Sequence, residues 1–175
     1  TPGLRALQTR AALEELLGRL IEARDALPPE GKAPMFLKVA PDLDAAEIEA
    51  ISDVVAVAGL DAVIVSNTTI SRPPLKSDHA GEAGGLSGAP LMALSTQTLR
   101  LFHQAARGRF PLAGAGGVRS GADAYAKIRA GACVVQLYSA LVFSGPGLVV
   151  KIKADLAARL RADGFASTAE AVATA

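Results

Sequence analysis

The chain has 175 residues, enough for one domain at about 100 to 200 residues per domain. Its 18 Lys and Arg residues balance 17 Asp and Glu residues, so the net charge of +1 gives no basis for a nucleic-acid binder or a basic membrane-binding tail. Half of the residues are hydrophobic, which excludes an intrinsically disordered chain.

The sequence gives little support for a disulfide-stabilised protein, a metal site or a membrane-spanning segment. The single cysteine, Cys133, excludes an internal disulfide and a cysteine-based zinc site, and His79 and His103 are well separated, so we expect no metal. Cys133 begins an apolar run and is expected to be a small core residue. Residues 130–150 carry no charge, but Pro146 and several polar residues predict a strand, a turn and a helix start there rather than a membrane span.

Hydrophobic periodicity predicts helices and strands in alternation. Leucines at helical spacing predict a helix over residues 11–26, and the nearly continuous apolar run at residues 34–40 is typical of a strand buried on both faces. Asp44 and Glu47 form a capping box that begins the next helix, and Gly59 ends it. The remaining elements expected are a strand at residues 62–66, an irregular segment at 67–90, a helix at 95–107, a strand at 111–113, a helix at 121–130, a strand at 133–137 and a last helix at about 147–163.

The order of these elements indicates a repeated βα unit. An Ala-Gly helix end precedes a strand twice, at Ala58-Gly59 and at Ala130-Gly131. Four strands alternating with helices fit either half of a (β/α)8 barrel or a small doubly wound sheet, and periodicity does not separate the two. In both architectures a ligand binds at the carboxyl ends of the strands, so the residues just after each strand are the candidates for function.

Polar residues follow the first two strands. Lys38 ends the first, where a lysine either reaches solvent or places a cation against an anionic or electron-rich ligand. Residues 66–69, Ser-Asn-Thr-Thr, supply four consecutive hydrogen-bonding side chains where one helix cap would suffice, which favours a ligand site over turn chemistry. The irregular segment that follows is much longer than the usual ~2 to 6 residues of such a connection, and long loops of this kind are commonly lids or ligand clamps.

Glycines and hydroxyls follow the last two strands. Gly114-Ala115-Gly116-Gly117 comes after the third strand, Ser120 with Asp123 caps the next helix, and Tyr138-Ser139 comes after the fourth strand. Glycine lets the backbone approach a ligand closely, and exposed N–H groups attract phosphate, so the two adjacent ends predict a phosphate cradle. The spacing departs from the dinucleotide pattern Gly-x-Gly-x-x-Gly, which favours a mononucleotide-type phosphate over NAD.

Taken together, the strand ends resemble the FMN-dependent dihydroorotate dehydrogenases, specifically the membrane-associated, quinone-dependent class. The motifs occur in the family's order and run nearly from end to end of the chain. They are Thr1-Pro2-Gly3-Leu4-Arg5, Lys38-Val39-Ala40-Pro41-Asp42-Leu43, Ser66-Asn67-Thr68-Thr69, Gly84-Gly85-Leu86-Ser87-Gly88-Ala89-Pro90-Leu91 and Gly116-Gly117-Val118. Because the family's fold is a (β/α)8 barrel, the resemblance implies that residues 1–175 are the C-terminal half of one FMN-binding barrel domain, its last four βα units.

The resemblance also implies a role for each matching residue. Lys38 is expected near the flavin ring and Ser66 in contact with FMN, while Asn67 and Thr68 hydrogen-bond the pyrimidine substrate. The residues implied to surround the FMN phosphate are Ser87, Gly88, Gly116, Gly117, Tyr138 and Ser139. Ser139 replaces the threonine frequent at that place in the family, which keeps the hydroxyl.

The implied reaction is the oxidation of dihydroorotate to orotate in pyrimidine biosynthesis, in which a base takes a proton, FMN takes a hydride and a quinone reoxidises the flavin. The base of this class is a serine a few positions before Thr1, so no catalytic residue is expected in this chain. The resemblance makes the N-terminal half of the barrel a necessary partner. Peripheral association with the cytoplasmic face of a bacterial inner membrane, or with the mitochondrial inner membrane, rests on the resemblance alone.

Two other functions remain open at the level of sequence. One is another FMN barrel oxidoreductase, such as a fumarate- or NAD-linked dihydroorotate dehydrogenase, which would differ in its upstream base, cysteine instead of serine, and in its electron acceptor. The other is a non-catalytic half-barrel that binds flavin without chemistry. Residues 66–69 argue against the second, because a scaffold does not need clustered donors of the kind that bind a substrate.

Overall fold

The computed structural model describes residues 7 and 9–174, and the first of the family motifs, Thr1-Pro2-Gly3-Leu4-Arg5, lies outside them. Four strands form one parallel sheet in the order β1-β2-β3-β4, so each strand pairs with the next along the chain. The strands are β1 (Phe36–Val39), β2 (Ala62–Val65), β3 (Leu112–Ala115) and β4 (Val134–Gln136). The helices are α1 (Arg10–Asp25), α2 (Ala45–Ala58), α3 (Met92–Ala106), α4 (Gly121–Arg129), α5 (Ser139–Ser144), α6 (Gly147–Ala162) and α7 (Thr168–Ala171), with short 3-10 turns η2 (Pro29–Gly31) and η3 (Ala89–Leu91).

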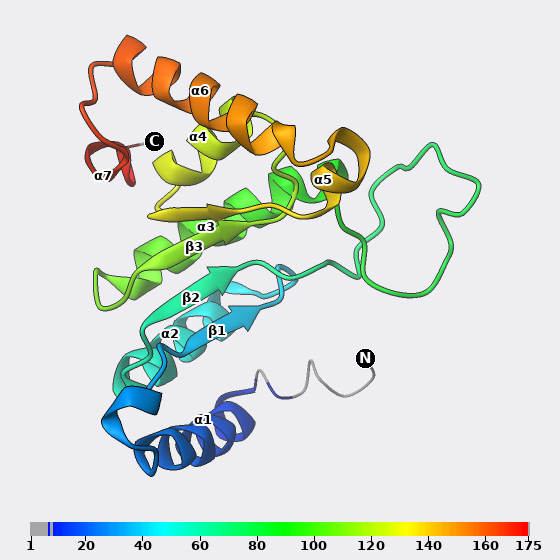
Figure 1. The fold of residues 1–175 in the computed structure, drawn as a ribbon. Helices are drawn as coiled ribbons and strands as arrows, with labels where there is room; N and C mark the ends of the chain where they lie inside the picture. The colour runs from blue at the N-terminus through cyan, green and yellow to red at the C-terminus, as the bar shows by residue number, and fades with distance from the viewer. Residues whose placement is uncertain (1–6, 8, 175) are drawn as a thin grey trace.

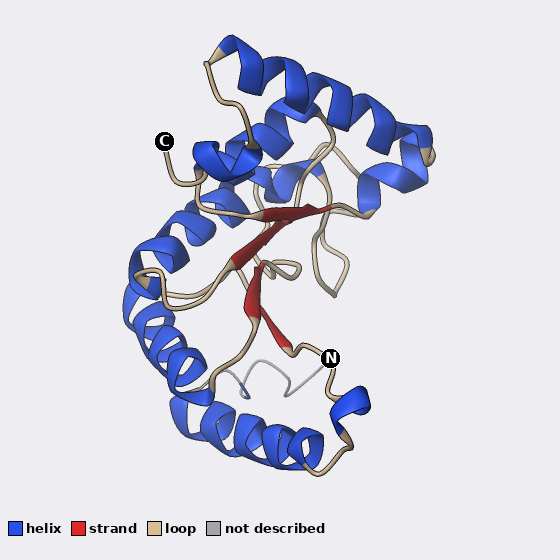
Figure 2. Cartoon of the chain, turned by 60° about the vertical axis from the view of Figure 1, so that its left-hand side comes forward, coloured by secondary structure: helices blue, strands red, loops and turns tan. Residues whose placement is uncertain are grey.

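The helices lie in an arc over one face of the sheet (Figures 1 and 2). This layer contains the main core, in which Val39, Val63 and Leu112 from the strands pack with Val55 of α2 and Phe102 of α3. Parallel strands with helical crossovers on a single side of a curved sheet are the arrangement of consecutive βα units in a barrel. A doubly wound sheet would carry helices on both faces, so the structure decides between the two architectures that periodicity left open.

The opposite face of the sheet carries no helix among the described residues, and its side chains on the two edge strands are exposed. Phe36 of β1 is 51% exposed and Val134 of β4 is 56% exposed. The prediction that the run at residues 34–40 forms a strand buried on both faces is therefore wrong for this chain. The expected burial of Cys133 is wrong for the same reason, because Cys133 precedes the edge strand β4 and is exposed.

Local chemistry explains why the central helices begin and end where they do. The capping box of α2 is complete, since the Glu47 N–H donates to Asp44 Oδ1 and the Asp44 N–H donates to Glu47 Oε2, both at 2.8 Å. Gly59 then ends the helix at φ 65°, a conformation that glycine adopts without strain. The predicted cap of α4 is also confirmed, because Ser120 Oγ accepts from the Asp123 N–H at 3.1 Å.

Several element boundaries differ from the sequence prediction. Helix α3 begins at Met92 instead of residue 95, since η3, with its proline in the first turn, leads directly into it. Strand β3 continues to Ala115, where Ala115 pairs with Gln136 of β4. Helices α5 and α7 were not predicted, and both are short. The uncharged stretch at residues 130–150 folds as β4, α5 and the first turn of α6. No helix among residues 9–174 has both the length and the apolar character needed to cross a bilayer.

Candidate functional site

The carboxyl ends of all four strands meet at one edge of the sheet, and a cavity of about 1060 Å³ lies there. Such a volume lies at the upper end of the range of small-molecule sites. The cavity is lined by every site residue that the sequence singled out, namely Lys38, Ser66, Asn67, Thr68, Ser87, Gly88, Gly116, Gly117, Tyr138 and Ser139. Side chains that sequence reasoning missed, among them Arg119, Gln136 and Phe143, also line it. Gln136 was identifiable in principle, since it is the last polar residue of a strand.

The end of β2 presents its polar groups in a fixed arrangement. Ser66 is buried and its hydroxyl donates to the Asn67 carbonyl at 2.9 Å. Asn67 donates its own N–H to the Val39 carbonyl at 2.7 Å, and its Oδ1 accepts from the Thr68 N–H at 2.9 Å. With Oδ1 engaged by the backbone, the side-chain NH2 of Asn67 is the part left to donate to a ligand in the cavity.

Asp42 anchors the start of the long loop (residues 67–90) that follows β2. Its carboxylate accepts from the Thr69 hydroxyl, from the Ser71 hydroxyl at 3.0 Å and from the Ile70 N–H at 3.3 Å. The chain returns beside this point, where Thr69 and Leu86 form an antiparallel bridge with N–H to carbonyl distances of 3.1 and 2.8 Å. The two ends of the loop are therefore held together at the rim of the cavity.

Arg72 strengthens the closure of the loop. Its guanidinium donates to the carbonyls of Glu82 at 2.9 Å and Gly84 at 2.7 Å, on the returning side of the loop. It also lies within 3.4 Å of the Thr69 carbonyl on the outgoing side. Hydrogen bonds from a charged donor are stronger than neutral ones, so Arg72 holds the two sides of the loop together at its base, and residues 73–81 extend beyond it.

Glycine is required where the returning chain passes Thr68. A Cβ atom built on Gly85 would lie 2.0 Å from Thr68 Oγ1, far inside contact distance. The loop therefore packs directly on the side chain of Thr68, one of the two predicted substrate ligands. The returning chain continues to Gly88, at φ 80°, and into η3.

The loop after β3 lies flat against the first turn of α3. Gly116 and Gly117 both have left-handed backbone conformations, with φ values of 95° and 82°. A Cβ on Gly117 would lie 2.5 Å from the backbone of Met92. Only glycine fits here, and the result is bare backbone facing the cavity, which is what a phosphate cradle needs.

Two hydroxyls meet across the cavity rim. Ser87 Oγ, from the long loop, lies 2.9 Å from Ser139 Oγ, in the first turn of α5. Tyr138 precedes Ser139 and is 82% exposed. Serine hydroxyls and backbone N–H groups next to the glycine loop form a donor set suited to the oxygens of a phosphate ester. The residues present thus fit a mononucleotide such as FMN.

One charged residue behind the glycine loop was not identified from the sequence. Lys127 of α4 has no solvent-exposed surface, and its Nζ donates to Ser95 Oγ at 2.6 Å. Burial lowers the pKa of Lys127 to about 7, with a further lowering from Arg100 and an opposing effect of Asp123. A lysine in the middle of an amphipathic helix is normally expected on the exposed face, so no signal in the sequence indicated that Lys127 is buried.

The other candidates lie away from the cavity. His79 pairs with Glu82 at 3.0 Å on the exposed part of the long loop, and His103 packs against Gly131. No group of three or more potential metal ligands occurs among residues 7 and 9–174. The Lys and Arg side chains of α6 are exposed and form a solvated face of that helix.

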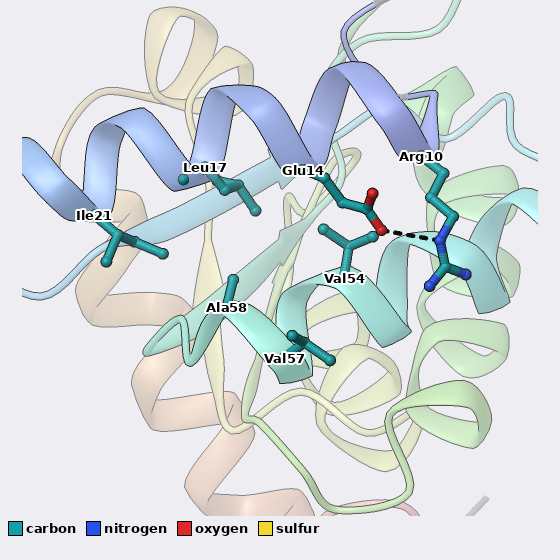
Figure 3. Close-up of a pocket in the computed structure, with 8 residues that line it drawn as sticks. Arg10, Glu14, Leu17, Ile21, Val54, Val57 and Ala58 are labelled. Carbon is teal, nitrogen blue, oxygen red and sulfur yellow. Dashed lines mark hydrogen bonds and ion pairs between the residues drawn. The ribbon is translucent and has the colours of Figure 1, made fainter.

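A second hollow, of about 290 Å³, lies between α1 and α2 on the outer side of the helix layer (Figure 3). Its walls are mainly aliphatic, and an ion pair between Arg10 and Glu14, 3.0 Å apart, stands at one end. The residues that line it are Arg10, Glu14, Leu17, Gly18, Ile21, Val54, Val57 and Ala58. It offers no hydroxyl, amide or glycine-loop donor, so the strand-end cavity is the better candidate for chemistry.

Comparison with known proteins gives one consistent result. The sequence profile of the family described as "Dihydroorotate dehydrogenase" matches residues 1–160. A protein of Azorhizobium caulinodans named dihydroorotate dehydrogenase (quinone) is 61% identical over 175 residues, covering 98% of this chain and 49% of the relative. A protein of Oryza sativa named dihydroorotate dehydrogenase (quinone), mitochondrial, is 51% identical, covering 98% of this chain and 38% of the relative.

Solved structures agree with the sequence relatives. A crystal structure of DHODH from Eimeria tenella in complex with ferulenol matches with a TM-score of 0.93 at 35% identity, over 98% of this chain and 50% of that one. The ligand-free type from the same organism matches with a TM-score of 0.92 at 34% identity. The chain thus spans about half the length of the bacterial relatives and solved structures that it matches. The predicted fold, four consecutive βα units of a (β/α)8 barrel, is confirmed.

Proposed function

We propose a function that proceeds from one premise: this chain belongs to the dihydroorotate dehydrogenase family. The proposed activity is the FMN-dependent oxidation of dihydroorotate to orotate with a quinone as electron acceptor, a step of pyrimidine biosynthesis. The observation that carries it is the single cavity at the strand ends, which unites a glycine cradle, a run of amide and hydroxyl donors and a lysine.

In this proposal the glycine loop and the rim hydroxyls hold the FMN phosphate. Gly116 and Gly117 offer backbone that no side chain covers, and Ser87 and Ser139 offer hydroxyls 2.9 Å apart. Gly88 and Tyr138 complete the lining at the same end of the cavity. When bound, FMN would accept the two electrons that leave the substrate on its oxidation.

Lys38 and Ser66 line the part of the cavity at the ends of β1 and β2, where the proposal puts the flavin ring. In this proposal the Lys38 ammonium stabilises the negative charge that arrives on the flavin with the electrons. Ser66 is held by its hydrogen bond to the Asn67 carbonyl, so its position is set before any ligand binds.

Asn67 and Thr68 hold the substrate in this proposal. The NH2 of Asn67 donates to a pyrimidine carbonyl or carboxylate oxygen, and the packing of Gly85 on Thr68 keeps the threonine hydroxyl at the cavity wall. Pre-set donors of this kind orient the substrate without a large cost in conformational entropy.

The proposal includes a companion half that completes the barrel. It would supply the base, a serine just upstream of residue 1, together with strands that pair with the open edges of β1 and β4. An open parallel sheet with one bare apolar face is unfavourable in water, so a covering half is physically required for a stable enzyme. The quinone and a peripheral position on a bacterial or mitochondrial inner membrane belong to the same proposal and rest on family membership.

The first test is the intact mass and the visible spectrum of the protein purified from its natural source. A mass about twice that of the 17.8 kDa chain, with flavin absorbance, is the expected result. A mass of about 18 kDa without flavin would contradict the proposal. Turnover of dihydroorotate with quinone, fumarate or NAD supplied in turn then tests the acceptor, and a preference for fumarate or NAD would replace the quinone-linked activity by one of its alternatives.

A further inference from the structure

Lys127 is the one charged side chain that is fully buried among residues 9–174. It belongs to α4 and passes beneath β3, where Gly114 leaves room for it: a Cβ on Gly114 would lie 3.1 Å from Lys127 Cβ. Keeping a lysine buried costs free energy unless its nitrogen finds partners, so its place calls for an explanation. The proposed function assigns it no task.

Lys127 is connected to the glycine cradle through one side chain. Its Nζ donates to Ser95 Oγ at 2.6 Å, and Ser95 Oγ lies 3.0 Å from the Gly116 carbonyl and 3.2 Å from the Met92 carbonyl. A serine hydroxyl has one hydrogen to donate and accepts as well. Ser95 therefore accepts from Lys127 and has one hydrogen for two carbonyls, of which that of Gly116 in the loop, at 3.0 Å, is the nearer. Both side chains, Lys127 and Ser95, are fully buried.

The contact between Ser95 and the Gly116 carbonyl also determines the direction of the next N–H group, that of Gly117. The peptide between Gly116 and Gly117 is trans, so its carbonyl and its N–H point in opposite directions. The carbonyl is held toward Ser95, behind the loop, and the Gly117 N–H is therefore directed away from α3, on the cavity side. No acceptor for this N–H occurs among the described residues.

We propose that Lys127 is a positioning residue for phosphate: through Ser95 it fixes the Gly116–Gly117 peptide so that the Gly117 N–H meets the phosphate of a flavin mononucleotide. The inference rests on the proposed function, because it takes FMN as the ligand. Without the relay this peptide, flanked by two glycines, is free to rotate and to turn its carbonyl oxygen toward the phosphate, which repels it.

The choice of lysine over an uncharged donor fits the same role. Burial lowers the pKa of Lys127 to about 7, so near neutral pH a neighbouring phosphate dianion favours the charged form. The ammonium then both strengthens the hydrogen bond to Ser95 and contributes a positive charge behind the cradle.

The test compares two ligands that differ only in the phosphate. Dissociation constants of FMN and of riboflavin are measured by flavin fluorescence on the assembled protein, this chain with its companion half, after removal of bound flavin. Lys127→Met is expected to weaken FMN binding at least tenfold and riboflavin binding less than twofold. Lys153→Met, which removes an exposed lysine of α6, is the matched control and should change neither.

A second variant keeps the inference testable if Lys127→Met does not fold. Ser95→Ala removes one oxygen and interrupts the same relay, so it should reproduce the loss of FMN affinity with riboflavin spared. The double variant should bind FMN no more weakly than the weaker single variant, because both act through one chain of contacts.

The outcomes separate the inference from the function on which it rests. Equal weakening of FMN and riboflavin, or no weakening of either, would overturn the role of Lys127 and leave the proposed function standing. Failure of the unmutated protein to bind either flavin would overturn both.

Discussion

Single glycines shape the candidate site by letting neighbouring segments approach closely. Gly85 makes room for Thr68, and Gly117 makes room for the backbone of α3. At both positions a methyl group would collide with a neighbour, and Gly117 also has a left-handed backbone. The shape of the cavity therefore depends on the absence of a Cβ atom at these positions, because glycine lets the backbone lie close to its neighbours and to the cavity.

Gly117→Ala tests this dependence. The added Cβ would lie 2.5 Å from the Met92 backbone at a φ of 82°, so the loop must move, and we expect a loss of about 2 to 4 kcal/mol in unfolding free energy. FMN affinity should fall at least tenfold. Gly18→Ala is the matched control, because nothing lies within 4 Å of the new atom in α1 and the helix should gain about 0.5 to 1 kcal/mol. Urea unfolding and flavin titration of both variants give the answer, and a Gly117→Ala protein as stable as the unmutated one would refute it.

Lys127 gives the protein a pH dependence of known sign. Its pKa is about 7 in the folded state, lowered first by burial and then by Arg100 on α3, with Asp123 on α4 acting against them. Unfolding returns it to the ordinary value of 10.5, so between pH 7 and 10.5 the unfolded chain binds more protons and stability rises with pH. The expected gain is roughly 3 to 5 kcal/mol across that window.

Urea unfolding at several pH values checks this sign. The protein freed of flavin should become more stable from pH 7 toward pH 10, and Lys127→Met should lack this rise. Lys153→Met should retain it, since the ammonium of Lys153 is exposed in both states. A fall in stability over the same range that Lys127→Met shares would show that other groups dominate.

At the scale of elements, the long loop (residues 67–90) combines fixed ends with an extended middle. Asp42 and Arg72 hold its base, and the Thr69–Leu86 bridge closes it, whereas residues 73–84 are mostly exposed. A segment with few buried contacts opens at low free energy, so the loop's closure depends on the few hydrogen bonds at its base.

Arg72→Met should release the loop. The variant loses the charged donor to the Glu82 and Gly84 carbonyls while keeping most of the aliphatic stem. Limited trypsin digestion should then cleave after Lys76 several times faster than in the unmutated protein, and the substitution removes no competing site, because the Arg72-Pro73 bond resists trypsin. Arg161→Met, on the exposed face of α6, should leave that rate unchanged. Equal rates in all three proteins would mean that Arg72 does not hold the loop.

Some of these elements could be predicted from the sequence and others could not. Helix α2 was predictable because both of its ends carry local signals, Asp44 with Glu47 at the start and Gly59 at the end. The positions of the candidate site residues followed from a rule of parallel sheets, that strand ends share one edge. Helix α5 was not predictable, since six residues without a side-chain cap give no periodicity. The burial of Lys127 was not predictable either, because it depends on space left by Gly114, which is adjacent only in the folded chain.

At the scale of the whole molecule, two strand edges and one apolar sheet face are left open among the described residues. Phe36 on β1 and Val134 on β4 lie at the two edges and face away from the helices. Unpaired parallel edges flanked by exposed apolar side chains are templates for association. The errors in the predicted burial of residues 34–40 and of Cys133 come from this one cause.

This chain produced alone should therefore associate. Light scattering is expected to show species larger than the 17.8 kDa monomer, and a hydrophobic dye should bind strongly. Production together with the N-terminal half of the Azorhizobium caulinodans relative, which is 61% identical over the region shared, should suppress both signals. Phe36→Lys, which places a charge on the bare face, should reduce dye binding without the companion. A monodisperse monomer that binds no dye would contradict the need for a second half.

The cavity at the strand ends touches all four βα units, and this gives a bound molecule a mechanical role. A ligand bound there contacts the ends of β1 and β2 as well as those of β3 and β4, so it bridges the two halves of the curved sheet. By mass action it would add about 2.7 kcal/mol to the stability of the folded state at a concentration one hundred times its dissociation constant. With FMN as the proposed ligand, the melting temperature should therefore rise with the concentration of FMN added, and a melting temperature independent of FMN would contradict its binding at this cavity.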